Sequence, residues 1–323
     1  MKKDNEAENE CPFVRRKESS HFGSYALSGD DQISYECSID GGIARGGNRR
    51  EVVPFGASTP CSMEYAKDCL HYMNEGHKII GMIHLDALSG YPQHRGMDRV
   101  IKNALHDAVE LEKGGVDSIL IENTDDDPHQ KVLGPEQIAA YTLAAQKIAE
   151  NTNLPLGICC LFNDYKTALS IAKIVGAEFV RVPVFNEAVI SSSGIIEADP
   201  YDVIVFRDKI NANHIKILAD VQVKHAYSLS RRPIQESAAE ILHFKADELV
   251  ITGRFTGDMP ALEDLKAVRE ALPDSHINIG SGTTPDNVKT LTEYANAVIV
   301  GTYFKVDGRM NAEKVKELRK AIE

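Results

Sequence analysis

The chain has 323 residues, of which 43% are hydrophobic, so it can form one large core with residues left over for an appendage. Its formal net charge of −12 argues against nucleic acid or an anionic membrane as a partner, because phosphate groups would be repelled over most of the surface. Its six cysteines lack paired CxxC spacing, which is typical of a reducing compartment. No apolar run reaches the roughly 20 residues of a membrane-spanning helix, so no membrane insertion is expected.

The first part of the chain lacks the periodicity of a folded domain. Residues 1–61 have no sustained apolar period and many Ser, Gly and charged residues, which predicts a disordered or loosely attached extension. The acidic residues among the first ten oppose a transit peptide or a secretory signal, so a cytoplasmic location is expected. Residues 62–76 combine an apolar stripe with a closing Gly76 and predict a short helix that caps the following domain.

From residue 77 onward, short apolar runs alternate with longer stretches of helical period, as in βαβ units with a parallel sheet. The eight predicted strands are Ile79–His84, Ser118–Glu122, Leu156–Leu161, Phe179–Val184, Ile215–Val221, Leu249–Thr252, Ile277–Gly280 and Ala297–Val300. The predicted helices are Asp98–Lys113, Pro135–Glu150, Asp164–Val175, Asp202–Asn211, Ile234–Phe244, Leu262–Leu272, Pro285–Tyr294 and Ala312–Ile322. Eight units over residues 77–323 fit an α/β fold, the (β/α)8 TIM barrel of about 250 residues. No GxGxxG follows the first strand, and no cofactor is expected.

The predicted strands end in polar residues, and in this fold the ligand meets the C-terminal strand ends. The four candidate catalytic residues are His84, Glu122, Asp220 and Lys224, and the candidate substrate-binding residues are Asn123, Asn163, Arg181, His225, Thr252 and Gly253. Alternation places Asp220, Gln222 and Lys224 on one face if their strand stays extended. A partly desolvated carboxylate can act as a general base, and a buried lysine can form a Schiff base with a carbonyl. The alternative for Asp220 and Lys224 is a structural ion pair.

Alternatives also apply to the other candidates. For Glu122, an acid/base or substrate-binding role competes with a salt bridge, for which Arg181 is a candidate partner. His84 is interpreted as a hydrogen-bonding residue, because no HxH or HExxH spacing supports a metal site and none is predicted. The run Asp125–Asp127 is expected to be a solvated loop, and Cys159 and Cys160 are expected to serve packing.

The last two predicted strands end in glycine-bearing segments that suit an anion. Gly280, Ser281 and Gly282 lead into Thr284 and Pro285, which suit the start of a helix, and the eighth strand is followed by Gly301 and Thr302. Glycines let backbone N–H groups approach a phosphate, and barrels with phosphorylated substrates hold it at these two strand ends. The alternative is that the glycines only serve tight turns. We expect a phosphate site formed by Gly280, Ser281, Gly282, Gly301 and Thr302.

Five separate motifs, in order, resemble the BtpA/SgcQ family over residues 78–308. They are residues 83–92 (IHLDALSGYP), 115–123 (GVDSILIEN), 218–226 (LADVQVKHA), 251–257 (ITGRFTG), and 280–288 (GSGTTPDNV) with 300–302 (VGT). The resemblance implies a barrel similar to the ribulose-phosphate-binding group. Some family members accompany sugar-uptake operons, which fits a sugar phosphate, and a photosystem I biogenesis label also travels with the family. Ser89 stands where family members often have Pro, and the first 75 residues have no recognised counterpart.

Two functions follow as hypotheses. The first is an enzyme that acts on a small phosphorylated metabolite by isomerase, epimerase or aldolase-type lyase chemistry, with Asp220 as base and Lys224 as an electrostatic or Schiff-base partner. The second is a catalytically silent barrel that serves as an assembly or stability factor for other proteins, which an exposed apolar patch would favour. The expected partner is a small phosphorylated ligand, and whether the protein is a homo-oligomer is left open.

Overall fold

The structure is a computed structural model, and it describes residues 14–16, 35–37, 77–230 and 232–323. The chain divides into two units, Met1–Gly76 and His77–Glu323. In the first unit, strands β1 (Val14–Arg16) and β2 (Tyr35–Cys37) pair in antiparallel orientation. The rest of the predicted extension over residues 1–61 and the predicted capping helix over residues 62–76 lie outside the described residues.

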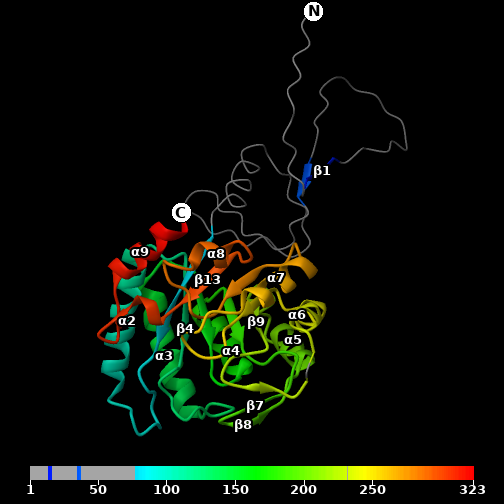
Figure 1. Cartoon of the computed structure of the whole chain (residues 1–323). Coiled ribbons are helices and arrows are strands. Elements are labelled where there is room, and N and C mark those ends of the chain that lie inside the picture. The colour runs from blue at the N-terminus through cyan, green and yellow to red at the C-terminus, as the bar shows by residue number, and fades with distance from the viewer. Residues whose placement is uncertain (1–13, 17–34, 38–76, 231) are drawn as a thin grey trace, which may run out of the picture. The chain divides into compact units, whose positions relative to one another are not determined.

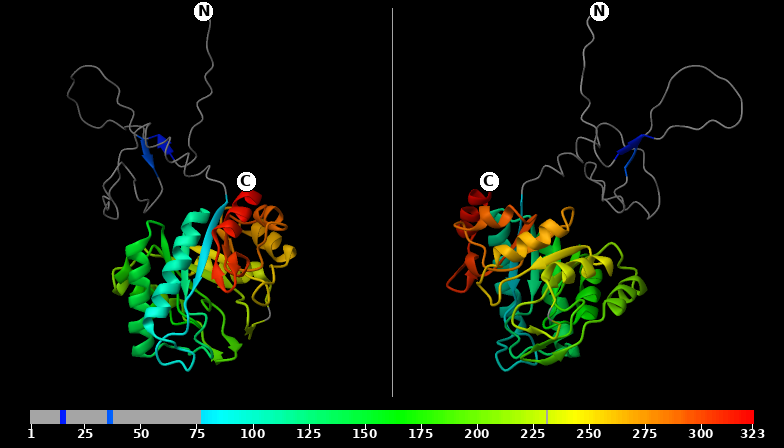
Figure 2. Two further views of the ribbon diagram at one scale, coloured as in Figure 1. Left: turned by 90° about the vertical axis from the view of Figure 1, so that its left-hand side faces the viewer. Right: turned by 45° about the vertical axis from the view of Figure 1, so that its right-hand side comes forward.

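The second unit is a closed barrel of eight parallel strands, so the predicted fold class is confirmed (Figure 1). The strands are β3 (Lys78–His84), β4 (Ser118–Glu122), β5 (Leu156–Cys159), β6 (Phe179–Val182), β9 (Lys216–Val221), β11 (Glu248–Ile251), β12 (Ile277–Ile279) and β13 (Ala297–Val300). Each strand pairs with the next along the chain, and β13 pairs with β3 to close the ring. Figure 2 shows this closure, with the cyan strand β3 beside the orange and red elements from the end of the chain.

Eight helices of the second unit lie outside the strands (Figure 1). They are α2 (Met97–Gly114), α3 (Pro135–Asn151), α4 (Tyr165–Val175), α5 (Pro200–Lys209), α6 (Ile234–His243), α7 (Leu262–Ala271), α8 (Val288–Thr292) and α9 (Ala312–Ile322). Helix α5 begins earlier than the predicted Asp202, because the Asp199 side chain accepts a hydrogen bond from the backbone N–H of Asp202 and Pro200 suits the first turn. The shortest helix, α8, covers only the middle of the predicted Pro285–Tyr294.

Short elements that were not predicted from the sequence lie at the C-terminal side of the barrel. Strands β7 (Val189–Ser191), β8 (Gly194–Ile196) and β10 (Tyr227–Ser228) form a small antiparallel sheet in the order β10-β7-β8. After β13 come a 3-10 turn, η1 (Thr302–Phe304), and a hairpin of β14 (Lys305–Val306) and β15 (Arg309–Met310). These elements build the loops around the mouth of the barrel.

The core has two apolar layers. Inside the barrel lie buried side chains from alternate strand positions: Ile80, Met82, Leu120, Cys159, Phe179, Leu218, Val250, Ala297 and Ile299. A larger apolar layer fills the space between the strands and the helices. Gly157 is required in the inner layer, because a Cβ at this position would lie 2.1 Å from the Phe179 ring. Full burial of each large aliphatic or aromatic side chain stabilises the fold by about 1.5–3 kcal/mol.

Below the inner layer, a polar group fills the N-terminal end of the barrel, and we call it the lower polar layer. It consists of Glu248 with its partners Lys216 (3.0 Å), His276 (3.0 Å) and Asn278 (3.0 Å). Burial alone would raise the pKa of Glu248, but its partners, His276 foremost, lower it to about 2. In the part of the chain that the structure describes, none of the helices combines the length and the apolar character needed to cross a bilayer.

Candidate functional site

Strand alternation turns four of the predicted residues into the C-terminal mouth of the barrel. The inner apolar layer includes Met82, Leu120, Phe179 and Leu218. Side chains two positions apart on a strand share a face. The residues that follow them into the mouth are therefore His84, Glu122, Arg181 and Asp220. The structure thus brings these four predicted side chains together at one end of the barrel, and the contacts between them are described next.

Arg181 is the central residue of the mouth. Its Nε and Nη2 donate to the two carboxylate oxygens of Asp220 at 2.8 and 2.7 Å, and its Nη1 lies 3.5 Å from Glu122 Oε2. All three side chains are at least nine-tenths buried. Burial alone would lower the pKa of Arg181, but the two carboxylates raise it. Asp220 therefore has Arg181 as its partner, not Lys224, and both of its oxygens are engaged, which leaves Glu122 as the more available base.

Lys224 reaches the mouth by a different route from the one predicted. Strand β9 ends at Val221, Gln222 has a positive φ of 53°, and the Gln222 side chain donates to the Arg232 carbonyl at 3.1 Å. The expected extended alternation through Gln222 to Lys224 is therefore wrong. Lys224 still interacts electrostatically with Arg181, Glu122 and Asp220, and burial, followed by the Arg181 charge, lowers its pKa. A lysine that loses its proton more easily is a better nucleophile.

His84 is also held in the mouth as a neutral group. Burial, followed by the charge of Lys305, lowers the pKa of His84 to about 4. Gly301 makes room for the imidazole, because a Cβ at position 301 would lie 2.8 Å from His84 Cε1. Lys305 is a mouth residue that sequence reasoning missed, since it stands beyond the predicted end of the last strand. Burial lowers its pKa too. The one available signal was a basic residue three positions after Thr302.

For Glu122, burial alone would raise the pKa, but Arg181, His84 and Lys224 together lower it. Thr124 Oγ1 donates to Glu122 Oε1 at 3.0 Å. Glu122 is thus ionised near neutral pH, buried, and adjacent to a neutral imidazole and a lysine with a lowered pKa. Such a set can accept a proton at one atom and deliver one at another.

The predicted phosphate loop after β12 offers several unused hydrogen-bond groups. Within the described residues, the backbone N–H groups of Ser281, Gly282 and Thr283 have no hydrogen-bond acceptor. The Oγ1 atoms of Thr283 and Thr252 are buried and have no partner there either. These donors are therefore available to an acceptor on a ligand. Thr252 belongs to the predicted set, whereas Thr283 was missed.

The predicted helix start at Thr284 and Pro285 is wrong. Asn287 Oδ1 accepts from the Thr284 backbone N–H at 2.9 Å, and α8 begins only at Val288. The turn before α8 is organised by Asn287, which the sequence did not mark. Because α8 has only five residues, its dipole adds little to an anion site, and the loop amides carry that interaction.

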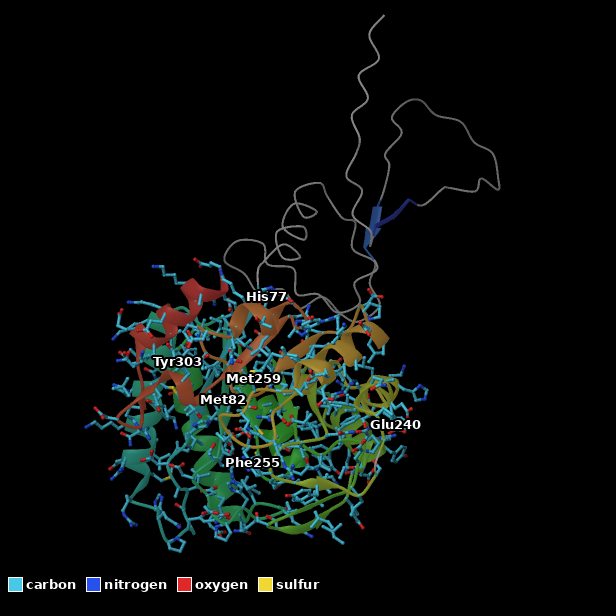
Figure 3. All side chains as sticks on the ribbon, in the orientation of Figure 1. His77, Met82, Glu240, Phe255, Met259 and Tyr303 are labelled. Carbon is cyan, nitrogen blue, oxygen red and sulfur yellow. The ribbon has the colours of Figure 1, made fainter. Side chains whose placement is uncertain are left out.

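The predicted phosphate loop is hydrogen-bonded to the loop between β11 and α7. Ser281 Oγ accepts from the Gly253 N–H at 2.9 Å and donates to the Asp258 carbonyl at 2.7 Å. Gly282 has a φ of +71°, and a Cβ there would lie 2.2 Å from the Met259 backbone nitrogen. Figure 3 shows Phe255, from the same loop, well toward the other end of the barrel from His77, the residue before β3. Ser281 and Gly253 therefore shape the site through this loop contact.

Three predicted substrate-binding residues hold loops in place. Asn123 donates to Asp126 at 3.0 Å and accepts from the Leu161 N–H at 2.8 Å. Asn163 makes two hydrogen bonds to the Val184 backbone, at 2.9 and 2.8 Å. His225 is exposed, contacts Thr256 at 2.8 Å, and interacts electrostatically with Lys224 and Glu122. Their hydrogen-bonding groups have protein partners, so any contact with a ligand remains a prediction.

The acidic run Asp125–Asp127 is not uniformly solvated, contrary to the expectation. Asp126 is 1% exposed and accepts from the Leu88 N–H at 2.7 Å, so it joins the loop after β3 to the loop after β4. Cys159 and Cys160 are buried free thiols, and burial raises their pKa well above the ordinary value. Among the described residues, no group of three or more His, Cys, Asp or Glu side chains could hold a metal ion.

Comparison with known proteins identifies the family of this barrel. Residues 75–323 match the model of the BtpA family. The chain belongs to the BtpA family. An uncharacterized protein from Archaeoglobus fulgidus is 35% identical over 243 residues, which cover 75% of this chain and 97% of that protein. The photosystem I biogenesis protein BtpA of Synechocystis is 35% identical, covering 72% of this chain and 82% of its own. The putative sgc region protein SgcQ of Escherichia coli is 29% identical, covering 71% and 87%.

The BtpA-family barrel of this chain also resembles solved structures of the same fold. One is the (S)-3-O-geranylgeranylglyceryl phosphate synthase of Thermoplasma acidophilum, solved with its substrate sn-glycerol-1-phosphate. The TM-score is 0.53 at 18% identity, over 79% of this chain and 97% of the synthase. At this level the likeness shows the barrel fold alone. The resemblance to the BtpA/SgcQ family drawn from the five motifs is confirmed.

Proposed function

We propose that this protein is an enzyme that binds a small phosphorylated metabolite, a sugar phosphate, at the C-terminal mouth of its barrel. The reaction is an isomerase, epimerase or aldolase-type lyase step. The phosphate lies on the amides of Ser281 to Thr283 and beside Gly301 and Thr302. The reacting carbons lie over Glu122, His84 and Lys224.

The observation that carries the proposal is the cluster of basic groups at the mouth of an acidic protein. Arg181 and Lys224 interact there electrostatically with Glu122 and Asp220, and His84 interacts with Lys305, Lys224 and Arg181, while the whole chain has a formal net charge of −12. Burial and mutual repulsion among these basic groups lower the pKa of Lys224 and His84. A bound dianion would relieve that repulsion. The vacant amides of Ser281 to Thr283 support phosphate as the anion.

The geometry supports a change in the catalytic roles. Asp220 was expected to be the base, but both of its oxygens bind Arg181, so the pair is better suited to position Glu122. Glu122 takes a proton from a carbon next to a carbonyl, and His84, neutral near pH 7, donates a hydrogen bond to that carbonyl oxygen. Lys224 stabilises the developing charge or, in the lyase reaction, forms a Schiff base. The synthase that shares this fold, solved with a glycerol phosphate, supports the ligand class by analogy.

The proposal is tested at Thr302, an exposed residue whose replacement costs the fold little. Phosphate and sugar phosphates at millimolar concentration should raise the melting temperature of the wild type. A ligand at 100 times its Kd raises the free energy of unfolding by about 2.7 kcal/mol. Thr302→Asp places a negative charge at the anion site and should abolish the rise, whereas the neutral, isosteric control Thr302→Asn should keep most of it. Gly282 is a poor test position, because any side chain there collides with Met259. No shift of the wild type with any ligand of the panel would refute the proposal.

One observation favours the second candidate, a non-catalytic assembly factor. Ile190 faces Tyr227 on one side and Ile195 on the other across the small sheet, and the three are 45%, 62% and 51% exposed. Such an apolar row on a surface suits contact with another protein. A relative bears the name photosystem I biogenesis protein. Two results together would favour this candidate. The first is that no ligand in the experiment above shifts the melting temperature. The second is that cells carrying Ile195→Lys lose the function of the protein although the variant stays as soluble as the wild type.

A further inference from the structure

A polar cavity lies next to the mouth, on the side away from β12. It is open to solvent, has a volume of about 560 Å³, and is lined by the loop between β3 and α2, the start of α2, the loop between β4 and α3, and Arg309 of β15. In the barrel, β13 separates β12 from β3, and β4 follows β3. The cavity thus adjoins the strands that carry His84 and Glu122, with the proposed phosphate loop beyond them.

The lining of the cavity differs chemically from the mouth. It contains three carboxylates, from Asp86, Asp125 and Asp127, and three guanidiniums, from Arg95, Arg99 and Arg309. The formal charges of these six side chains therefore balance. Its lining residues include no Phe, Tyr or Trp, and the His129 imidazole is the one aromatic ring among them, so it offers little stacking surface for a base or an apolar ring. Alternating acceptors and donors of this kind suit an uncharged group rich in hydroxyls.

Several of these polar groups lack protein partners. Asp86 is held by Arg99 at 3.1 Å and by Arg309 at 2.9 Å, so it belongs to the wall. Asp125 is exposed, and its carboxylate makes no hydrogen bond or ion pair with any residue that the structure describes. His129 Nδ1 is buried and likewise has no hydrogen-bond partner there. Unpaired acceptors and donors at a cavity wall are the groups that a ligand hydroxyl would satisfy.

Contacts connect the cavity with the catalytic groups. Thr124 lines the cavity and donates to Glu122 at 3.0 Å. Lys305 interacts electrostatically both with His84 in the mouth and with Asp125 in the cavity. A ligand that extends from the phosphate loop over His84 would therefore meet the cavity next.

We infer that this cavity binds the hydroxyl-rich end of the ligand, so that the substrate is a polyhydroxylated sugar phosphate longer than a glycerol phosphate. The inference rests on the proposed function and adds to it a second subsite and a lower limit on the length of the ligand. Asp125 and Asp127 accept hydrogen bonds from ligand hydroxyls, and His129 contributes a further partner.

Titration calorimetry with three probes tests the subsite: inorganic phosphate, sn-glycerol 1-phosphate, and a panel of pentose and hexose phosphates. At least one sugar phosphate should bind ten times more tightly than inorganic phosphate or glycerol phosphate. Asp125→Asn should weaken the binding of that sugar phosphate about tenfold, because its hydroxyls lose a charged hydrogen-bond acceptor. The Kd of inorganic phosphate, which has no such hydroxyls, should stay within twofold. Asp127→Asn is a second variant with the same expectation. The matched control is Asp274→Asn, an exposed carboxylate in the turn between α7 and β12.

The outcomes distinguish the two proposals. One outcome is that inorganic phosphate binds to the wild type and fails to bind to Thr302→Asp, while no sugar phosphate binds more tightly than inorganic phosphate. This result would refute the subsite and leave the proposed function standing. Equal weakening of phosphate and sugar phosphate by Asp125→Asn also refutes the subsite. If no probe binds at all, the proposed function fails and the subsite fails with it.

Discussion

The two ends of the barrel interior both contain buried carboxylates, but the partners of these carboxylates differ between the two ends. In the lower polar layer, Glu248 has three partners, and its pKa falls to about 2. At the mouth, one guanidinium serves both Glu122 and Asp220. Around it, Lys224 and Lys305 form no ion pair within the described residues, and burial lowers their pKa values. The lower layer satisfies its own charges, whereas the mouth is left for a ligand to complete.

The largest expected effect is on stability, and it comes from Arg181. Arg181→Met leaves Asp220 and Glu122 as unpaired buried charges and should lower the free energy of unfolding by about 3–5 kcal/mol. The matched change in the lower layer, Lys216→Met, should cost about 1 kcal/mol or less, because the Lys216 side chain is 61% exposed. Chemical denaturation measures both. Similar losses in the two variants would remove the contrast between the layers.

The next effect is a pH dependence that His84 introduces. In the folded protein the pKa of His84 is about 4, below its ordinary value of 6.5, so the unfolded chain binds a proton that the folded chain does not. The stability of the folded protein therefore carries no penalty from His84 above pH 6.5. As the pH falls from 6.5 toward 4, the free energy of unfolding decreases by about 3 kcal/mol at most. His84→Gln should flatten the stability profile in this window. An unchanged slope between pH 6.5 and 4 would show that His84 is solvated.

The smallest expected change in stability is at Lys224. Because its ammonium is desolvated and has no ion pair among the described residues, Lys224→Met should leave the melting temperature unchanged or raise stability by about 1 kcal/mol. The same variant should weaken phosphate binding about tenfold, since it removes a basic group from the mouth. A clear loss of melting temperature would instead identify Lys224 as part of a structural pair and overturn its catalytic role.

The fold could be predicted from the sequence because barrel strands buried on both faces are continuous apolar runs. Ser118–Glu122 and Ala297–Val300 match the observed β4 and β13 in both bounds. The small sheet was missed, since β7, β8 and β10 are only two or three residues long and carry little periodic signal.

The candidate site was predicted only in part. Glu122, Arg181 and Asp220 were candidates because they are polar residues of predicted apolar strands, but the sequence cannot assign their partners, and the Arg181–Asp220 contact joins residues 39 apart in sequence. The course of the chain after β9 was unpredictable, because a positive φ is usual for glycine and uncommon for Gln222. Lys305 was not predicted, because it lies beyond the eighth strand in a segment without a distinguishing pattern.

The bridge that Ser281 makes between the Gly253 N–H and the Asp258 carbonyl has a consequence for exchange with solvent. The two loops are fastened together, so opening either one breaks the same hydroxyl contacts. Anything that orders residues 281–283 therefore also slows the opening of residues 253–258. In a hydrogen–deuterium exchange experiment, protection by a bound anion would extend from the loop after β12 into the loop after β11, which contributes no amide to the anion itself.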